Sequence, residues 1–261
     1  MTIANDLVLR HDDSGITRLT LNRPEARNAL SLEMMRQFMA HLESMAHDPA
    51  VRVVILSGNG PAFCAGHDLK ELRADGTPGF YAKVFALASR IMLAITEMPR
   101  PVIAEVHGIA TAAGAQLVAT CDLAIAADNA RFATPGVNIG LFCSTPMVAL
   151  SRAVASKHAM EMLLTGDMIG AAEAQRIGLI NRAVPEAELA GAALALARKI
   201  AAKSVYTLKT GKGAFYRQRE MDLKHAYDYA AHIMTENMQA IDAAEGIDAF
   251  LQKRQPAWQD C

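Results

Sequence analysis

The stretch HGIATAAGAQLVATCDLAIAAD, residues 107–128, decides the fold expected for this chain. The run VIAEVHG (102–108) leads into it, and DLAIAAD (122–128) closes it; both are apolar and typical of buried strands. Between them, glycines and alanines predict a close backbone approach, and a helix is expected to begin near Gly114. Gln116 is the one long polar side chain in this small-residue region. The stretch therefore predicts a strand–helix–strand unit that exposes backbone beside a single carboxamide.

The residues before this stretch predict the same alternation of strands and helices. LVLRHD (7–12) and ITRLTLN (16–22) flank the turn DDSG and predict a hairpin. The segment 31–48 has apolar residues at helical spacing behind a capping serine, VRVVILSG (51–58) is typical of a strand buried on both faces, and a second helix is expected from about 81 to 97. Alternating strands and helices predict right-handed crossovers and a mostly parallel sheet.

The second half of the chain is mainly helical in pattern. From about Thr145 onward helical spacing dominates, interrupted by the glycine-containing segment 165–185, and no strand is predicted near the C-terminus. The fold class is therefore α/β. We expect an α/β core over residues 1–195 and a helical region over residues 196–261.

Composition narrows the class of protein. The chain has 261 residues, 52% of them hydrophobic, and a formal net charge of -1, so it has no overall field that would attract nucleic acid. We find no uncharged apolar run of the ~20 residues that cross a bilayer, and the N-terminal residues lack the features of a signal or transit peptide. A cytoplasmic protein without membrane contact is expected. The four cysteines and eight histidines show no disulfide or metal-ligand spacing, and we expect no metal.

Several familiar motifs are missing or incomplete. SGNGPAF (57–63) has two glycines after a strand but lacks the third glycine of a dinucleotide-binding turn, and there is neither a P-loop nor a G-x-S-x-G elbow. Basic residues between Arg198 and Arg219 alternate with aromatic residues, which would suit nucleic acid. A solvated helix face is the favoured interpretation of that segment, and nucleic-acid binding is unlikely.

Two loops that follow strands remain as a candidate site. FCAGHDLKEL (63–72) contains a small A-G turn, and the 107–128 stretch leads into a helix N-terminus. Amides at a helix N-terminus carry partial positive charge and suit a developing oxyanion. If one amide from each loop met at the same carbonyl oxygen, they would form an oxyanion hole of the kind that thioester chemistry requires.

Five segments in one order resemble the enoyl-CoA hydratase/isomerase (crotonase) superfamily, and the similarity runs nearly end to end. They are LNRPEARNALS (21–31), FCAGHDLKEL (63–72), HGIATAAGAQLVATCDLAIAAD (107–128), TGDMIGAAEAQRIGLINRAVP (165–185) and EGIDAFLQKRQPAW (245–258). The resemblance implies a spiral of ββα turns with a helical C-terminal trimerisation region, assembling as a homotrimer or a dimer of trimers. It also implies binding of acyl-CoA thioesters, with coenzyme A as part of the substrate and no other cofactor. The chain is most similar to relatives named "enoyl-CoA hydratase domain-containing".

The resemblance assigns roles to particular residues. The backbone N–H groups of His67 and Ala113 would form the oxyanion hole, and the two catalytic glutamates of hydratases would fall at Gln116 and Gly136. Neither residue can exchange a proton near neutral pH, so ordinary hydratase activity is not expected. The coenzyme A part would contact Arg27, Ala65, His67, Asp68, Leu69 and Lys70, and Phe250 and Lys253 would reach a ligand bound to a neighbouring subunit.

Other side chains could replace the missing acids. His67 and Cys143 are the foremost candidates, ahead of Glu71, Thr134, Asn138, Ser144 and Thr145, while Arg23 is expected to be structural. The leading hypothesis is an acyl-CoA enzyme that stabilises an enolate-type oxyanion. The alternatives are an acyl-CoA-binding protein without chemistry and, less favoured, RNA binding through the basic C-terminal helix.

Overall fold

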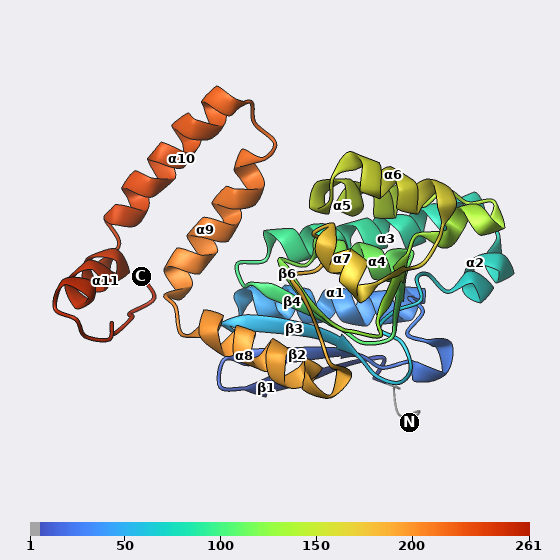
Figure 1. Ribbon diagram of the computed structural model, residues 1–261, viewed down its shortest axis with the longest axis horizontal. Coiled ribbons are helices and arrows are strands. Elements are labelled where there is room, and N and C mark those ends of the chain that lie inside the picture. Colours follow the sequence, from blue (N-terminus) through green and yellow to red (C-terminus); the bar gives the residue numbers. More distant parts are fainter. Residues whose placement is uncertain (1–5) are drawn as a thin grey trace.

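A six-stranded sheet forms the base of the molecule in the computed structural model, which describes residues 6–261 (Figure 1). Its order is β1-β2-β3-β4-β6-β9, and every neighbouring pair is parallel except β1 and β2, which form the predicted hairpin. The strands are β1 Val8–Asp13, β2 Ile16–Leu21, β3 Val53–Gly58, β4 Val102–Val106, β6 Leu123–Ala127 and β9 Arg182–Val184. The mostly parallel sheet is thus confirmed, while the start of the N-terminal segment, residues 1–5, lies outside the described residues.

The central strands are mainly apolar because both faces of the sheet are covered, and Ser57 in β3 and Glu105 in β4 are the polar exceptions. Val54 and Leu56 of β3 point into the main core, and Val53 and Ile55 point to a second cluster on the opposite face. Helices α1 (Leu32–His47) and α3 (Pro78–Glu97) cover the first face, and α8 (Leu189–Ala201) covers the second. This is the pattern expected of a strand buried on both sides.

A second, smaller sheet completes the spiral. It has the order β5-β7-β8, from Ile109–Thr111, Arg131–Ala133 and Ile169–Gly170. One chain segment supplies β4 to the large sheet and β5 to the small sheet before α4 (Ala113–Thr120) begins, and β6 and β7 repeat this order. The bend between β4 and β5 occurs at Gly108, whose φ of +58° favours glycine. The structure therefore has the predicted ββα turns.

The remaining helices of the body surround these sheets. They are α2 Leu69–Asp75, α5 Ser144–Ala153, α6 Ser156–Thr165 and α7 Ala171–Arg176, with 3₁₀ turns at Pro24–Ala26 (η1), Pro135–Ile139 (η2) and Glu186–Glu188 (η3). Among the described helices, α3 alone is long and apolar enough to cross a membrane by length and composition. Val84, Ala88, Ile91, Met92 and Ile95 of α3 are buried against the core, and 28% of its most apolar 18-residue window is buried in all.

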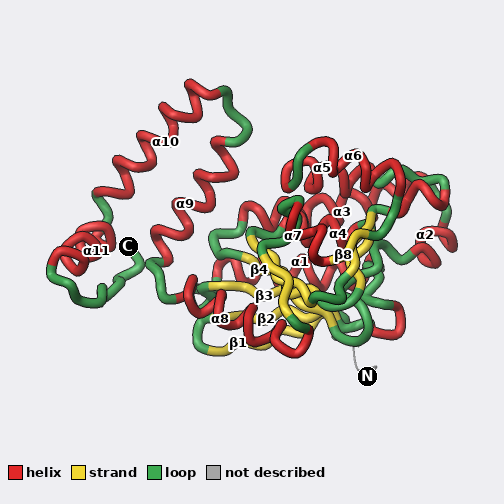
Figure 2. Tube along the Cα trace, viewed as in Figure 1, coloured by secondary structure: helices red, strands yellow, loops and turns green. Residues whose placement is uncertain are grey.

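Three C-terminal helices stand apart from the sheets (Figures 1 and 2). They are α9 Val205–Gln218, α10 Leu223–Met238 and α11 Ile241–Leu251, and we call them the arm. The expected division after residue 195 falls inside α8, which packs on the large sheet. The body therefore continues to the end of α8, and the arm begins with α9.

Candidate functional site

The two candidate loops lie side by side because their backbones are hydrogen-bonded. The Cys64 N–H donates to the Ile109 carbonyl over 3.1 Å, and the Thr111 N–H donates to the Cys64 carbonyl over 3.0 Å. Residues 63–65 thus run beside β5 as an additional short strand. Parallel pairing with β5 places the A-G turn at the N-terminus of α4.

Small residues are required where these loops meet. A β-carbon on Gly66, whose φ is +100°, would lie 2.9 Å from the Ala112 β-carbon and 3.5 Å from the Ala113 nitrogen. A β-carbon on Gly114 would overlap the Cys64 carbonyl oxygen. The small residues of the 107–128 stretch thus allow the two candidate loops to touch. That contact in turn leaves backbone groups of both loops exposed.

The amides of His67 and Ala113 have no acceptor among the described residues. The Leu30 N–H donates to the Gly66 carbonyl over 2.7 Å, and the Asp68 N–H donates to the Leu30 carbonyl over 3.1 Å. The His67 N–H lies between these two bonds and takes part in neither. Ala113 is the first residue of α4, so its N–H has no partner within the helix. Two donors on adjacent loops are therefore free to bind an anion or a polarised oxygen.

Ala112 holds the start of α4 in an unusual backbone conformation. Its φ and ψ are 50° and -115°, a backbone conformation that residues other than glycine rarely adopt. Its own N–H donates to the Ala133 carbonyl over 2.9 Å, and its carbonyl accepts the Gln116 N–H over 3.0 Å. Such strain costs about 1–3 kcal/mol and is concentrated at functional sites, so it supports a role for the adjacent Ala113 amide.

Gln116 is buried near this helix start. It is 4% exposed, and its side-chain Oε1 has no hydrogen-bond partner among the described residues. The backbone carbonyl of Gln116 accepts a hydrogen bond from the Thr120 hydroxyl over 2.7 Å. A buried polar atom without a partner is rare, and a ligand atom would satisfy it.

Gly136 sits in η2, where the backbone is too crowded for a side chain. A β-carbon there would overlap the Leu141 carbonyl oxygen and lie 2.9 Å from the Cys143 sulfur. The loop is closed by the Leu141 N–H, which donates to the Gly136 carbonyl over 2.9 Å. The space that an acidic side chain at residue 136 would need is thus occupied by the backbone of the same loop.

The two foremost replacement side chains are uncharged at neutral pH. Burial lowers the pKa of His67 to about 4, and both ring nitrogens are buried without a partner in the described chain. The ring packs edge-on against Phe85 of α3, with centroids 5.3 Å apart. Burial raises the pKa of the Cys143 thiol, although the Gly136 backbone N–H opposes this. Neither group is charged near pH 7.

Three of the other candidate side chains already have structural partners. Glu71 accepts the Leu32 N–H over 2.8 Å at the start of α1, Thr134 donates to the Met162 carbonyl over 2.8 Å, and Ser144 donates to the Phe142 carbonyl over 3.3 Å. For Asn138 and Thr145, no side-chain hydrogen bond is found among the described residues. Glu71 is the one acid among these five, and its Oε2 is already engaged at the start of α1.

The residues expected to bind coenzyme A divide into exposed and structural ones. Arg27, Leu69 and Lys70 are exposed, and the Arg27 carbonyl accepts the Ala65 N–H over 3.0 Å. The Asp68 carboxylate is engaged within the protein, because it caps α2 and accepts from Arg23 Nη1 over 2.6 Å. Burial raises the Asp68 pKa, but the hydrogen bond and charge of Arg23, together with the backbone N–H groups of Glu71 and Lys70, outweigh it and the net pKa is lowered. Arg23 is structural, as predicted.

Phe250 and Lys253 lie far from these residues within one chain. Phe250 belongs to α11 and is 82% exposed, and Lys253 follows that helix. Figure 1 shows α11 at the end of the molecule opposite to α2, the helix that contains Leu69 and Lys70. Any contact of Phe250 and Lys253 with a ligand at the two amides would therefore come from another copy of the chain.

A cavity of about 870 Å³ lies between α3, α4, α5 and α9. Gln116 is the only expected site residue in its wall, together with residues such as Met92, Val148 and Phe215. Neither His67 nor Ala113 lines it. The cavity thus adjoins the site on the Gln116 side without containing the two amides.

The basic segment 198–219 includes a buried lysine. Lys212 Nζ donates to the Ile95 carbonyl, the Arg100 carbonyl and Asp122 Oδ2, over 2.8, 2.9 and 2.7 Å. All three of its donors are used inside the protein, so Lys212 is unavailable to nucleic acid. Across the described chain, no group of three metal-ligating side chains is found.

Known proteins resemble this chain in sequence and fold over almost its whole length. The sequence profile of the family described as "Enoyl-CoA hydratase/isomerase" matches residues 11–261. A rat protein named enoyl-CoA hydratase domain-containing protein 3, mitochondrial, is 47% identical over 252 residues, covering 97% of this chain and 84% of its own. The crystal structure of an enoyl-CoA hydratase from Mycobacterium smegmatis is 50% identical, has a TM-score of 0.95 and covers 97% of this chain and 99% of its own. That of human enoyl-CoA hydratase domain-containing protein 3 is 47% identical, with a TM-score of 0.94 and coverages of 97% and 100%. The chain belongs to the enoyl-CoA hydratase/isomerase family, also called the crotonase superfamily.

Proposed function

We propose that this protein binds acyl-CoA thioesters and polarises the thioester carbonyl with the backbone N–H groups of His67 and Ala113. The observation that carries the proposal is that both donors are free and lie on loops in direct contact. Negative charge that develops on the carbonyl oxygen of an enolate would be stabilised there. Removing one such donor costs ~10²–10³ in rate in comparable sites.

The reaction is limited by the groups that surround the amides. Gln116 is an amide, Gly136 has no side chain, and His67 is neutral above its lowered pKa. General acid–base groups each contribute ~10²–10⁴, so ordinary hydration should be slow. Chemistry that needs little help from a protein base, such as decarboxylation of an acyl-CoA, fits this site best, whereas isomerisation would need another group to move the α-proton.

A second candidate function is acyl-CoA binding without turnover. It is favoured by the crowding at Gly136, where the backbone takes the space that an acidic side chain would need. Such a protein would bind the thioester and polarise it without moving a proton at the α-carbon.

Both candidates can be tested with butyryl-CoA labelled with ¹³C at the thioester carbonyl. Infrared spectroscopy would follow the carbonyl stretch, and mass spectrometry in D₂O would follow deuterium at the α-carbon. Ala113→Pro removes the N–H at the first residue of α4, and Ser156→Pro, which removes the N–H at the first residue of α6, is the control.

We expect the stretch to move to lower frequency on binding, and the shift to shrink in Ala113→Pro but not in Ser156→Pro. Deuterium uptake would show that the site moves the α-proton as an enzyme does. Binding without uptake would exclude enolate proton chemistry and leave either a non-catalytic protein or an enzyme that acts without loss of the α-proton. A bound thioester with an unshifted carbonyl would rule out the two-amide site. Absence of any saturable binding would rule out an acyl-CoA protein of either kind.

Assembly and location are separate parts of the proposal. We propose a homotrimer or a dimer of trimers, which would bring Phe250 and Lys253 of one chain near the amides of another. We also propose a cytoplasmic location for the chain as given. The rat relative's name places that protein in mitochondria, so fractionation of cells that express the chain should decide between the two compartments.

A further inference from the structure

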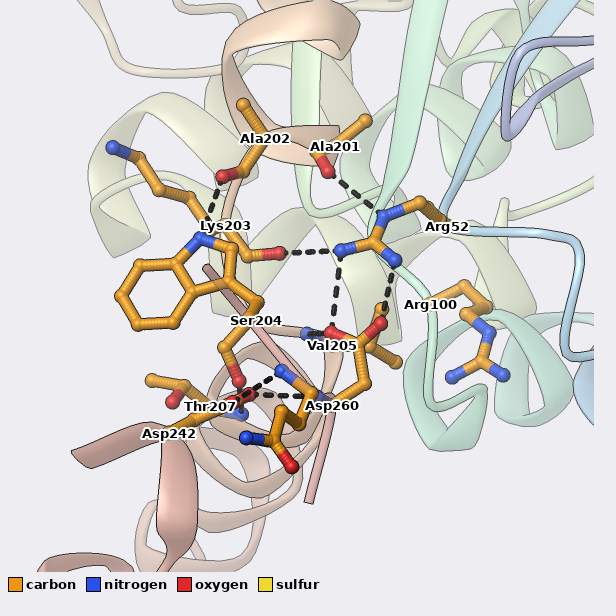
Figure 3. Close-up of polar contacts among 12 residues, drawn as sticks. Arg52, Arg100, Ala201, Ala202, Lys203, Ser204, Val205, Thr207, Asp242 and Asp260 are labelled. Atoms are coloured by element: carbon orange, nitrogen blue, oxygen red, sulfur yellow. Dashed lines mark hydrogen bonds and ion pairs between the residues drawn. The ribbon is translucent and has the colours of Figure 1, made fainter. Parts of the chain in front are cut away.

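The last residues of the chain fold back and join the arm to the body (Figure 3). We call residues 254–261 the strap, because they follow α11 and contact both α11 and the junction between α8 and α9. Phe250 and Lys253 lie on α11 or directly after it, immediately before the strap. The strap is therefore placed to control where these two residues stand.

On the α11 side, the strap makes a series of polar contacts and one packing contact. Glu245 and Asp242 of α11 are the acceptors, and Asp242 is only 2% exposed. The contacts are Arg254 Nη1 to Glu245 Oε1 (2.6 Å), Ala257 N to Glu245 Oε1 (2.6 Å), Gln259 N to Asp242 Oδ1 (2.7 Å), Asp260 N to Asp242 Oδ2 (3.0 Å), and the Trp258 ring 3.2 Å from where a β-carbon on Gly246 would lie. The strap is thus fixed to α11.

On the body side, Arg52 connects three elements at one point. It lies just before β3, and its guanidinium binds the C-terminal end of α8 and the strap together. The contacts are Arg52 Nε to the Ala201 carbonyl (2.8 Å), Arg52 Nη2 to the Lys203 carbonyl (2.9 Å), Arg52 Nη1 to Asp260 Oδ2 (2.7 Å), Val205 N to Asp260 Oδ1 (2.7 Å) and Trp258 Nε1 to the Ala202 carbonyl (2.9 Å). An arginine at the last carbonyls of a helix is favourable, and a carboxylate partner adds charge-assisted bonds.

The surroundings make Asp260 hard to replace as a partner. Figure 3 shows Arg100 beside this cluster, and no carboxylate lies within salt-bridge distance of Arg100 among the described residues. Burial lowers the pKa of Arg100, and the charge of Arg52 adds to this effect. Removing the Asp260 charge would leave the nearby charges of Arg52 and Arg100 without the carboxylate that offsets part of their repulsion, and Asp48 would be the remaining acid that acts on Arg100. The strap would then lose its main attachment to the body, while the core of the large sheet would be untouched.

We propose that Arg52 and Asp260 are positioning residues, which hold α11 so that Phe250 and Lys253 contact the coenzyme A part of an acyl-CoA bound to a neighbouring copy. This inference rests on the proposed function of the two amides. Neither Arg52 nor Asp260 touches the substrate. Their effect is on affinity, through the placement of α11, and they leave the polarised carbonyl unchanged.

The test compares Asp260→Asn with Asp260→Glu, which restores the charge, and with Glu173→Gln, which removes an exposed ion pair with Arg176 on α7. Trp258→Phe, which deletes the indole N–H bond to Ala202 and shortens the ring that packs against Gly246, is a milder second variant should Asp260→Asn fold poorly. Three quantities are measured: hydrogen exchange of residues 241–251 with β3 as the internal reference, the dissociation constant of butyryl-CoA, and the carbonyl stretch of the bound thioester.

We expect Asp260→Asn to speed exchange in α11 and to weaken butyryl-CoA binding by about fivefold, the upper range for one partly exposed ion pair. The carbonyl stretch and the exchange of β3 should not change. Asp260→Glu should recover most of the affinity, and Glu173→Gln should behave like the wild type.

Two results would overturn the proposal. One is that hydrogen exchange in α11 is the same in Asp260→Asn as in the wild type, which would mean that the strap does not hold this helix. The other is fast exchange in α11 with unchanged affinity, which would mean that α11 does not contribute to binding. If the wild type bound no butyryl-CoA, the proposed function would fail. The hydrogen exchange of α11 would still test the strap, because unchanged exchange in Asp260→Asn would show that the strap does not hold this helix.

Discussion

Gly136 shows how a single position can decide what chemistry a scaffold supports. The sequence alone presents it as a place where an acid is missing. The structure adds that the Leu141 carbonyl and the Cys143 sulfur occupy the space around its missing side chain. An acid could return here only if the segment from η2 to α5 changed its path. The loss of the acid is thus built into the backbone.

We therefore predict that Gly136→Ala lowers the free energy of unfolding by about 1–3 kcal/mol, as overpacking does in well-packed sites. Gly191→Ala in α8 is the matched control, because nothing lies within 4 Å of its added β-carbon. That control should be neutral or stabilising by roughly 0.5–1 kcal/mol. Urea unfolding of both variants measures the difference. Equal stabilities would mean that the η2 loop yields easily and that a glutamate could be accommodated.

His67 should make the protein sensitive to acid. Its pKa of about 4 in the folded protein lies below the value of ~6.5 expected when unfolded, so the unfolded chain binds a proton first as pH falls. Stability is then unaffected above pH ~6.5 and decreases between that pH and the folded pKa, by at most about 1.4 kcal/mol per pH unit. Below the folded pKa the loss is complete.

The prediction is that His67→Gln loses less stability than the wild type between pH 7.5 and pH 5, by up to about 2 kcal/mol. Urea unfolding at the two pH values gives the comparison, and His232→Gln on the exposed surface of α10 is the control. If the wild type and His67→Gln lost the same stability, the ring would titrate normally and would be open to solvent.

Among the elements, α9 is joined to the body by a largely buried ion pair. Lys212 binds Asp122 and two carbonyls, and Tyr216, one turn further along, donates to Asp122 Oδ1 over 2.9 Å. Burial lowers the Lys212 pKa, but Asp122 opposes this effect. Asp122 also accepts the Val102 N–H over 2.7 Å, so one carboxylate joins α9 to the starts of β4 and β6.

Lys212→Met should lower the free energy of unfolding by about 3–5 kcal/mol, because it leaves a buried carboxylate without its charged partner. Lys209→Met, on the exposed side of the same helix, should change it by less than about 0.5 kcal/mol. Adding Asp122→Asn to Lys212→Met should recover part of the loss, which chemical denaturation can measure. A small effect of Lys212→Met alone would show that the pair is hydrated.

The elements also show which parts of the fold the sequence could predict. Long periodic or continuous apolar runs gave β3, β4, α1 and α3 to within a few residues, because burial on one or two faces dictates their pattern. Four strands of two or three residues each, namely β5, β7, β8 and β9, are not predicted from the sequence, because such short segments show no alternation of polar and apolar residues. Helix α2 is not predicted either, because its seven residues are too few to show a helical pattern. The free amides of His67 and Ala113 were anticipated through the family resemblance. The crowding at Gly136 and the burial of Lys212 depend on contacts between distant segments, which no local pattern contains.

At the scale of the whole molecule, the expected site is divided between two distant places. The free amides are in the body, and the exposed Phe250 is on the arm, which extends from the opposite end (Figure 1). A heterologous, ring-closing assembly would let each arm reach the next body, so that every copy gives and receives one contact. A complete site would then exist only between chains.

Mixing two defective variants tests this arrangement directly. One variant carries Phe250→Ala and Lys253→Ala and keeps its amides, and the other carries Ala113→Pro and keeps its arm. Each alone should bind butyryl-CoA weakly. After dissociation and reassembly in equal amounts, random pairing around a ring should place intact amides beside an intact arm at about a quarter of the sites. Titration should then reveal a fraction of sites with wild-type affinity. If the arm served its own body instead, no such fraction would appear at any mixing ratio, because neither chain carries both intact parts.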